Sequence, residues 1–95
     1  MNEMVLLAVF YYEMVARGLS YDAVFLSVDE SMVGLLDEEY NIKGTLEDLE
    51  KIADVCIANK WLQRTSADPY YNFLSLTEKG LQKIMDFEYQ NVDKE

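Results

Sequence analysis

The stretch Thr45–Phe87 decides the fold, and it reads TLEDLEKIADVCIANKW, LQRTSADPYYNFLSL and TEKGLQKIMDF. In the first piece, apolar residues recur every three or four positions, as they do in a helix that buries one face. The second piece has two strand-like runs on either side of a Ser-Ala-Asp-Pro turn, which is typical of an antiparallel hairpin. The third piece returns to helical spacing. We therefore expect a helix, a two-stranded hairpin and another helix, in that order.

The helix of the first piece has its own start and stop signals. Thr45 is a favoured N-cap residue, and Asp48 stands three residues later, where a capping box prefers Glu or Gln. The helix should end near Asn59–Lys60. Its buried side is predicted to hold Leu46, Leu49, Ile52, Ala53, Cys56 and Ile57.

Strands are predicted over Trp61–Thr65 and Tyr70–Leu76, with the turn at 66–69 between them. Alternation along the second strand would place Tyr71 and Phe73 on one face. These aromatic side chains either cover a thin core or form an exposed contact surface beside Trp61.

The last helix is predicted to begin after Thr77, which is a favourable cap residue. Residues 89–95, at the end of the chain, are expected to fray. The packing stripe of this helix is predicted to be Leu81, Ile84, Met85 and Phe87.

Three further helices are expected before Thr45. The first should cover Asn2–Arg17, because its first residue is a plausible N-cap and Gly18 suits the left-handed position after a helix. A short helix is expected over Tyr21–Leu26. Another is expected within Asp29–Tyr40, with Ser31 as its cap.

The first of these helices is apolar in every direction around its axis between Val5 and Tyr12. Such a helix is normally buried on all sides, and a small domain rarely surrounds one of its own helices. The surplus apolar surface could meet a second copy and form a homodimer, or later segments of the chain could wrap it. The residues predicted for a dimer interface are Leu6, Val9, Phe10 and Tyr12.

Two places in the chain carry a family resemblance. One is Ala58–Arg64, where a helix gives way to a strand, and the other is Leu74–Leu81, where a strand leads into Leu-Thr-Glu-Lys-Gly. Together they resemble the second half of a winged helix-turn-helix domain of the kind found in MarR-like and PadR-like regulators. The resemblance implies an α+β, mostly helical fold with the hairpin as the wing, in one domain over residues 1–95.

The resemblance also implies a regulator whose helix after Thr45 enters the major groove of DNA while the wing follows the minor groove. The charge of this chain departs from that pattern. The helix offers four carboxylates against the single cation Lys51, whereas phosphate contacts usually come from Lys and Arg. The preceding segment adds further carboxylates, with only Lys43 opposing them. This acidic face is predicted to comprise Asp37, Glu38, Glu39, Glu47, Asp48, Glu50 and Asp54.

The amino-acid composition limits the kinds of binding and catalytic site that the chain can carry. The chain has 18 Asp and Glu residues against 8 Lys and Arg residues, so its net charge of −10 repels nucleic acids and anionic membranes. It has no histidine, no glycine-rich phosphate loop and one cysteine, Cys56, which is expected to be a buried apolar residue rather than a reactive thiol. We therefore expect no catalytic site, no cofactor and no metal. A single cysteine and the absence of a signal-peptide pattern before the apolar run Met4–Tyr12 favour the cytoplasm.

Two functions remain open. The acidic face can be a solvated surface or can bind a basic protein, in which case the chain is a non-enzymatic, homodimeric interaction module that does not bind DNA in the usual way. The alternative is a DNA-binding regulator that gathers its cations onto one surface. Those cations would be Lys43, Lys51, Lys60, Arg64, Lys79 and Lys83.

Overall fold

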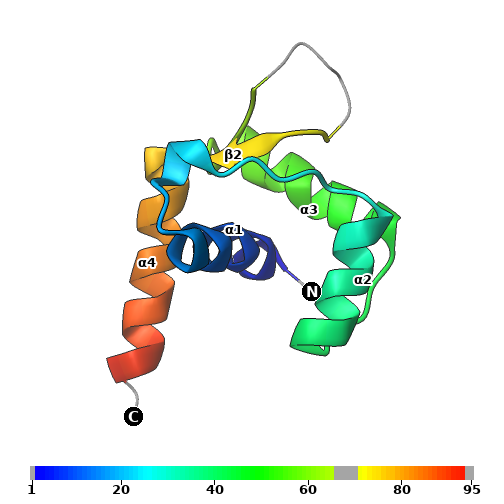
Figure 1. Ribbon diagram of the computed structural model, residues 1–95, viewed down its shortest axis with the longest axis horizontal. Coiled ribbons are helices and arrows are strands. Elements are labelled where there is room, and N and C mark those ends of the chain that lie inside the picture. The colour runs from blue at the N-terminus through cyan, green and yellow to red at the C-terminus, as the bar shows by residue number, and fades with distance from the viewer. Residues whose placement is uncertain (1, 66–70, 94–95) are drawn as a thin grey trace.

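The computed structural model describes residues 2–65 and 71–93 of the chain. The described part is α+β and mostly helical, with one antiparallel hairpin, and it confirms this part of the predicted fold (Figure 1). The predicted turn at 66–69 and the last two residues lie outside the described ranges. The elements are α1 (Glu3–Arg17), the 3-10 turn η1 (Tyr21–Ala23), α2 (Glu30–Tyr40), α3 (Leu46–Ala58), β1 (Leu62–Arg64), β2 (Leu74–Leu76) and α4 (Glu78–Asp93).

Helix α1 begins and ends as the sequence predicts. The side-chain oxygen of Asn2 accepts a hydrogen bond from the backbone N–H of Val5 at 3.2 Å. Gly18 adopts the left-handed conformation, with φ 66°, and its backbone N–H bonds back to the last turn. Because glycine has no Cβ, it takes this conformation without steric cost and ends the helix cleanly.

The start of α2 differs from the prediction. Asp29, not Ser31, is the N-cap, since its carboxylate accepts a hydrogen bond from the backbone N–H of Met32 at 3.2 Å. Ser31 lies inside the first turn of the helix. Both residue types favour N-caps, and the backbone of Asp29 is the one that is extended. The predicted helix over Tyr21–Leu26 is also shorter, a single 3-10 turn.

The hairpin is short, and β2 has neighbours on both edges. Leu62 pairs with Leu76, and Arg64 pairs with Leu74. On the other edge of β2, Leu26 and Leu74 exchange two backbone hydrogen bonds of 2.9 and 2.8 Å. The second strand is shorter than predicted because Phe73 has a φ of 55°, which interrupts the extended backbone before Leu74.

The junction between the hairpin and α4 is tight. The backbone N–H of Thr77 donates to the carbonyl oxygen of Trp61 at 3.1 Å, and the Thr77 hydroxyl donates to the carbonyl oxygen of Lys60. The same hydroxyl oxygen accepts from the N–H of Gly80 at 2.9 Å, so Thr77 caps α4 as predicted. A Cβ atom on Gly80 would lie 1.9 Å from the Trp61 oxygen. The Leu-Thr-x-x-Gly motif therefore has a steric explanation here.

The packing stripe predicted for α4 is only partly right. Ile84 is fully buried and Leu81 is half-buried, but the side chains of Met85 and Phe87 are 45% and 40% exposed. The helix runs through Asp93. Met85 and Phe87 are two positions apart, so they lie on nearly opposite sides of α4, flanking the buried Ile84.

Helix α1 forms the centre of the core, with α3, α4, η1 and β2 packed around it (Figure 1). Leu6, Val9 and Phe10 are therefore almost completely buried within the chain, and the prediction that they form a dimer interface is wrong for this fold. Tyr12 alone of the four predicted residues is exposed, at 40%. The other buried apolar residues are Leu7, Val24, Val28, Met32, Leu36, Leu49, Ala53, Cys56, Leu62, Leu74, Leu76 and Ile84.

Candidate partner-binding surface

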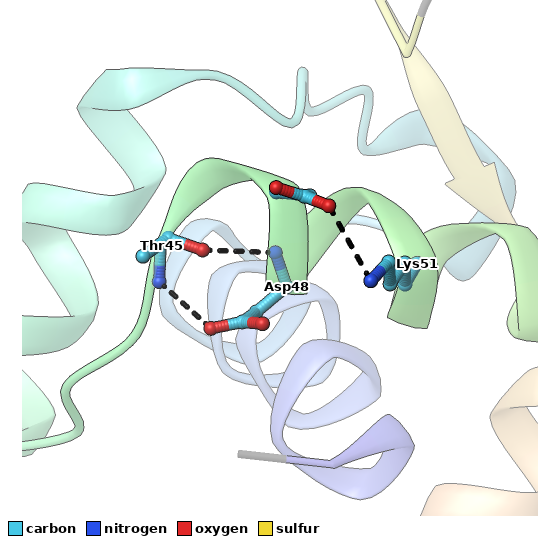
Figure 2. A network of polar contacts seen from close by, with 4 residues as sticks. Thr45, Asp48 and Lys51 are labelled. Atoms are coloured by element: carbon cyan, nitrogen blue, oxygen red, sulfur yellow. Dashed lines mark hydrogen bonds and ion pairs between the residues drawn. The ribbon is translucent and has the colours of Figure 1, made fainter.

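The first turn of α3 is fixed by a complete capping box (Figure 2). The Thr45 hydroxyl oxygen accepts from the backbone N–H of Asp48 at 3.1 Å, and the Asp48 carboxylate accepts from the backbone N–H of Thr45 at 3.2 Å. Hydrogen bonding from Thr45 to this carboxylate, chiefly from the backbone N–H, lowers the pKa of Asp48 below its ordinary value. Aspartate at the third helical position thus serves the role usually filled by Glu or Gln.

The buried and exposed sides of α3 are separated as predicted. Leu49, Ala53 and Cys56 face the core, and the intervening charged side chains lie on the other side of the helix. Of its carboxylates, Glu50 is half-buried, and those of Glu47, Asp48 and Asp54 are exposed.

The cation of α3 is already paired. The Lys51 ammonium lies 3.4 Å from the Glu47 carboxylate one turn earlier (Figure 2). Both side chains are more than 70% exposed, so the pair contributes little to stability, on the order of 0–1 kcal/mol. It nevertheless reduces the positive charge that Lys51 could present to a phosphate.

Asp54 links α3 to the segment that precedes β2. The Tyr71 hydroxyl donates to the Asp54 carboxylate at 2.8 Å, and this hydrogen bond is the main reason that the pKa of Tyr71 is raised. The Arg64 guanidinium lies 5.3 Å from the centre of the Tyr71 ring. Tyr71 is thus half-buried, whereas Phe73 is 59% exposed and does not share its surroundings. Tyr70 lies outside the described residues.

The second part of the acidic face lies at the C-terminal end of α2. Asp37, Glu38 and Glu39 are exposed in its last turns, and no basic residue accompanies them in the last turn. Lys43, in the following loop, donates to the Asp37 carboxylate at 2.9 Å. The loop over residues 41–45 joins this helix end to the start of α3. The structure therefore places the two acidic groups at adjoining ends of successive helices.

The six cations of the alternative prediction have diverse surroundings. Lys43 and Lys51 each pair with a carboxylate of the acidic face. The Lys83 ammonium lies 5.1 Å from the centre of the Trp61 ring at the α4 junction. Arg64 lies against Tyr71, and two lysines, Lys60 and Lys79, are exposed near the start of α4.

Residues 2–65 and 71–93 contain no group of three or more potential ligands placed to hold a metal ion. Cys56 is completely buried, as predicted, and burial raises the pKa of its thiol to about 12, with a smaller effect of Glu3. Among the described helices, none is long and apolar enough to cross a membrane.

A groove that the sequence does not predict lies between α1, α2 and α4. It has a volume of about 340 Å³ and is mainly apolar. Three segments far apart in the chain build it, so no local sequence pattern could have located it. The lining residues include Val5, Ala8, Tyr12, Tyr40, Phe87 and Glu88.

Comparison with known proteins gives no further assignment: no protein-family model, curated protein or solved structure matches this chain.

Proposed function

We propose that this chain is a small winged-helix interaction module, without enzymatic activity, that binds a basic protein through the acidic face and not DNA. The order of the elements supports the winged-helix part of the proposal. In the described part of the chain, three α-helices precede a two-stranded hairpin and a last helix, which is the order that the resemblance implies.

One observation carries the functional proposal. On the outward side of α3, which would enter the major groove in a DNA-binding relative, the carboxylates of Glu47, Asp48 and Asp54 are exposed. Lys51 is already paired with one of them. An approach to DNA would bring these carboxylates toward phosphates, which also carry negative charge. A protein surface rich in Lys and Arg would instead be attracted to these carboxylates.

The acidic end of α2 adds independent support. The C-terminal end of a helix carries a partial negative charge, so the carboxylates of Asp37, Glu38 and Glu39 are placed where the helix dipole disfavours them. An unfavourable placement of this kind costs about 0.3–1 kcal/mol per charge. Sequences that depart from such local rules often do so at functional sites.

DNA binding remains the second candidate, because Lys60 and Arg64 flank the start of the hairpin. Fluorescence anisotropy with a labelled short DNA duplex separates the two functions. At about 50 mM salt, where weak electrostatic binding should be visible, we expect no binding by the native chain. Micromolar binding that is abolished by Arg64→Glu would overturn the proposal in favour of a regulator.

A charge-reversal variant tests the acidic face directly. Replacing Glu47, Glu50 and Asp54 together with Lys should allow DNA binding, if repulsion by α3 is what prevents it. A control variant with Lys at Asp22, Glu30 and Glu78 has the same net charge but leaves α3 unchanged, and it should bind DNA no better than the native chain. An equal gain in DNA affinity in both variants would show that total charge, and not the charge of α3, prevents DNA binding.

The protein partner is tested with the same pair of variants. Basic proteins retained from a host lysate by the native chain and by the control variant, but not by the α3 variant, would support the acidic face as the contact surface. Retention that is the same for all three chains would contradict it.

A further inference from the structure

The groove between α1, α2 and α4 is separate from the outward side of α3, and it is preformed by contacts among its own walls. The Tyr12 hydroxyl donates to the Glu88 carboxylate at 2.8 Å, which joins α1 to α4 across one edge. The rings of Tyr12 and Tyr40 stack with their centres 6.3 Å apart, which joins α1 to α2. These contacts hold the three helices around the groove.

The apolar surface continues beyond this groove. A second hollow of about 310 Å³ shares Met4 and Phe87 with it and also borders Lys83 and Asp86. The two hollows share Met4 and Phe87 as a common border, so together they offer room for more than one apolar side chain of a bound helix.

The edges of the groove are acidic. Glu88 lines it directly. Glu39 and Glu13 lie close enough to Tyr40 to contribute, after burial, to raising the pKa of its hydroxyl. Arg17 pairs with Glu13 at 2.9 Å, while neither Glu39 nor Glu88 forms an ion pair with any cation in residues 2–65 and 71–93. A second copy of this chain, with a net charge of −10, would be repelled from these edges.

We propose that the groove binds an amphipathic helix with a net positive charge, whose apolar residues enter the two hollows and whose Lys or Arg residues reach Glu39 and Glu88. The apolar lining sets the helix orientation, and the carboxylates select its charge. The proposal does not depend on the α3 part of the acidic face, because Phe87 and the other walls lie on different helices from the outward side of α3. Glu39, at the end of α2, belongs to both surfaces.

The test uses a labelled synthetic peptide of about 14 residues, or four helical turns, in which Leu and Lys are spaced to form one apolar face and one basic face. Fluorescence anisotropy should show micromolar binding that weakens as salt is raised. A scrambled peptide of the same composition should bind about tenfold more weakly, since it lacks the apolar face. A peptide with Glu in place of Lys should also bind about tenfold more weakly, because the carboxylates at the groove repel it.

Two substitutions locate the binding. Phe87→Glu should weaken binding of the basic peptide by about tenfold even though it adds negative charge, because it disrupts both hollows. Glu88→Lys should weaken it by removing an acidic edge. The matched controls Phe25→Glu and Glu78→Lys make the same chemical changes on exposed residues away from the groove and should leave binding unchanged. Circular dichroism of each variant confirms that the helices are retained.

Several results would overturn the proposal. Equal binding of the scrambled peptide would mean attraction to total charge alone, and equal binding of the acidic peptide would exclude charge selection. Sedimentation as a dimer that excludes the peptide would mean that a second copy covers the groove. Loss of peptide binding in the α3 charge-reversal variant, with no effect of Phe87→Glu, would refute the groove and leave the acidic face as the binding site.

Discussion

Replacing Gly80 with Ala should destabilise the protein, although alanine is the better helix former. The added Cβ atom would lie 1.9 Å from the carbonyl oxygen of Trp61 and 2.7 Å from its carbonyl carbon. Both neighbours are backbone atoms, so relief requires α4 to move away from the start of β1 by about 1 Å or more. That movement would lengthen the 3.1 Å hydrogen bond from the Thr77 N–H to Trp61.

The magnitude follows from these contacts. Overpacking of a tight contact typically costs about 1–3 kcal/mol, and loss of a hydrogen bond about 1 kcal/mol. The gain in helix propensity from Gly to Ala returns about 1 kcal/mol at most. We expect a net loss of roughly 1–3 kcal/mol in the free energy of unfolding, which lowers Tm by about 4–24 °C in a domain of this size.

Gly34→Ala is the matched control. Gly34 lies within α2, and a Cβ atom there would have no heavy atom within 4 Å. The same chemical change should therefore stabilise the protein by about 0.5–1 kcal/mol. Urea unfolding followed by circular dichroism measures both variants. If Gly80→Ala were as stable as the native chain, the close approach of α4 to Trp61 would be refuted.

Three further predictions concern the capping box and the cysteine. Thr45→Ala should lower the free energy of unfolding by about 1 kcal/mol in urea unfolding, because the N–H of Asp48 loses its acceptor; an unchanged midpoint would contradict the cap. Since the folded pKa of Asp48 lies below the ordinary 3.8, its carboxylate stabilises the fold above that pH, and the stabilisation is lost as pH falls through the folded value. Asp48→Asn should thus destabilise the chain at neutral pH, and the difference from the native chain should shrink in strong acid; a difference independent of pH would disprove the linkage. Cys56, buried with a pKa of about 12, should resist alkylation by iodoacetamide at about pH 8 and react fully in denaturant, as mass spectrometry would show; rapid modification of the folded chain would mean that the site is accessible.

Much of the local structure could be predicted from short-range patterns. The limits of α1 and the capping box at Thr45 depend on hydrogen bonds within four residues, so the residue types at those positions are sufficient evidence. The inward side of α3 follows from the spacing of Leu49, Ala53 and Cys56. The predicted N-cap of α2 was wrong, because Asp29 and Ser31 are both favourable cap residues and only the backbone conformation distinguishes them.

The candidate sites depend on the sequence to different degrees. The charge of the acidic face is a property of composition, and its place on α3 follows from helical periodicity. The groove and the engagement of Asp54 by Tyr71 involve residues far apart in the chain, and neither has a local signal. The same is true of the pairing between Leu26 and Leu74.

The sequence by itself determined the order of the elements, the N-caps of α1, α3 and α4, and the strong negative charge, because each depends on neighbouring residues or on residue counts. The tertiary structure decided what covers α1. A helix that is apolar all round can be buried by its own chain or by a partner, and both solutions remove the same surface from water. Leu6, Val9 and Phe10 are covered by the chain itself, while Tyr12 and Phe87 remain at the surface. That division depends on how α3, α4 and β2 pack together, which no pattern within a single element specifies.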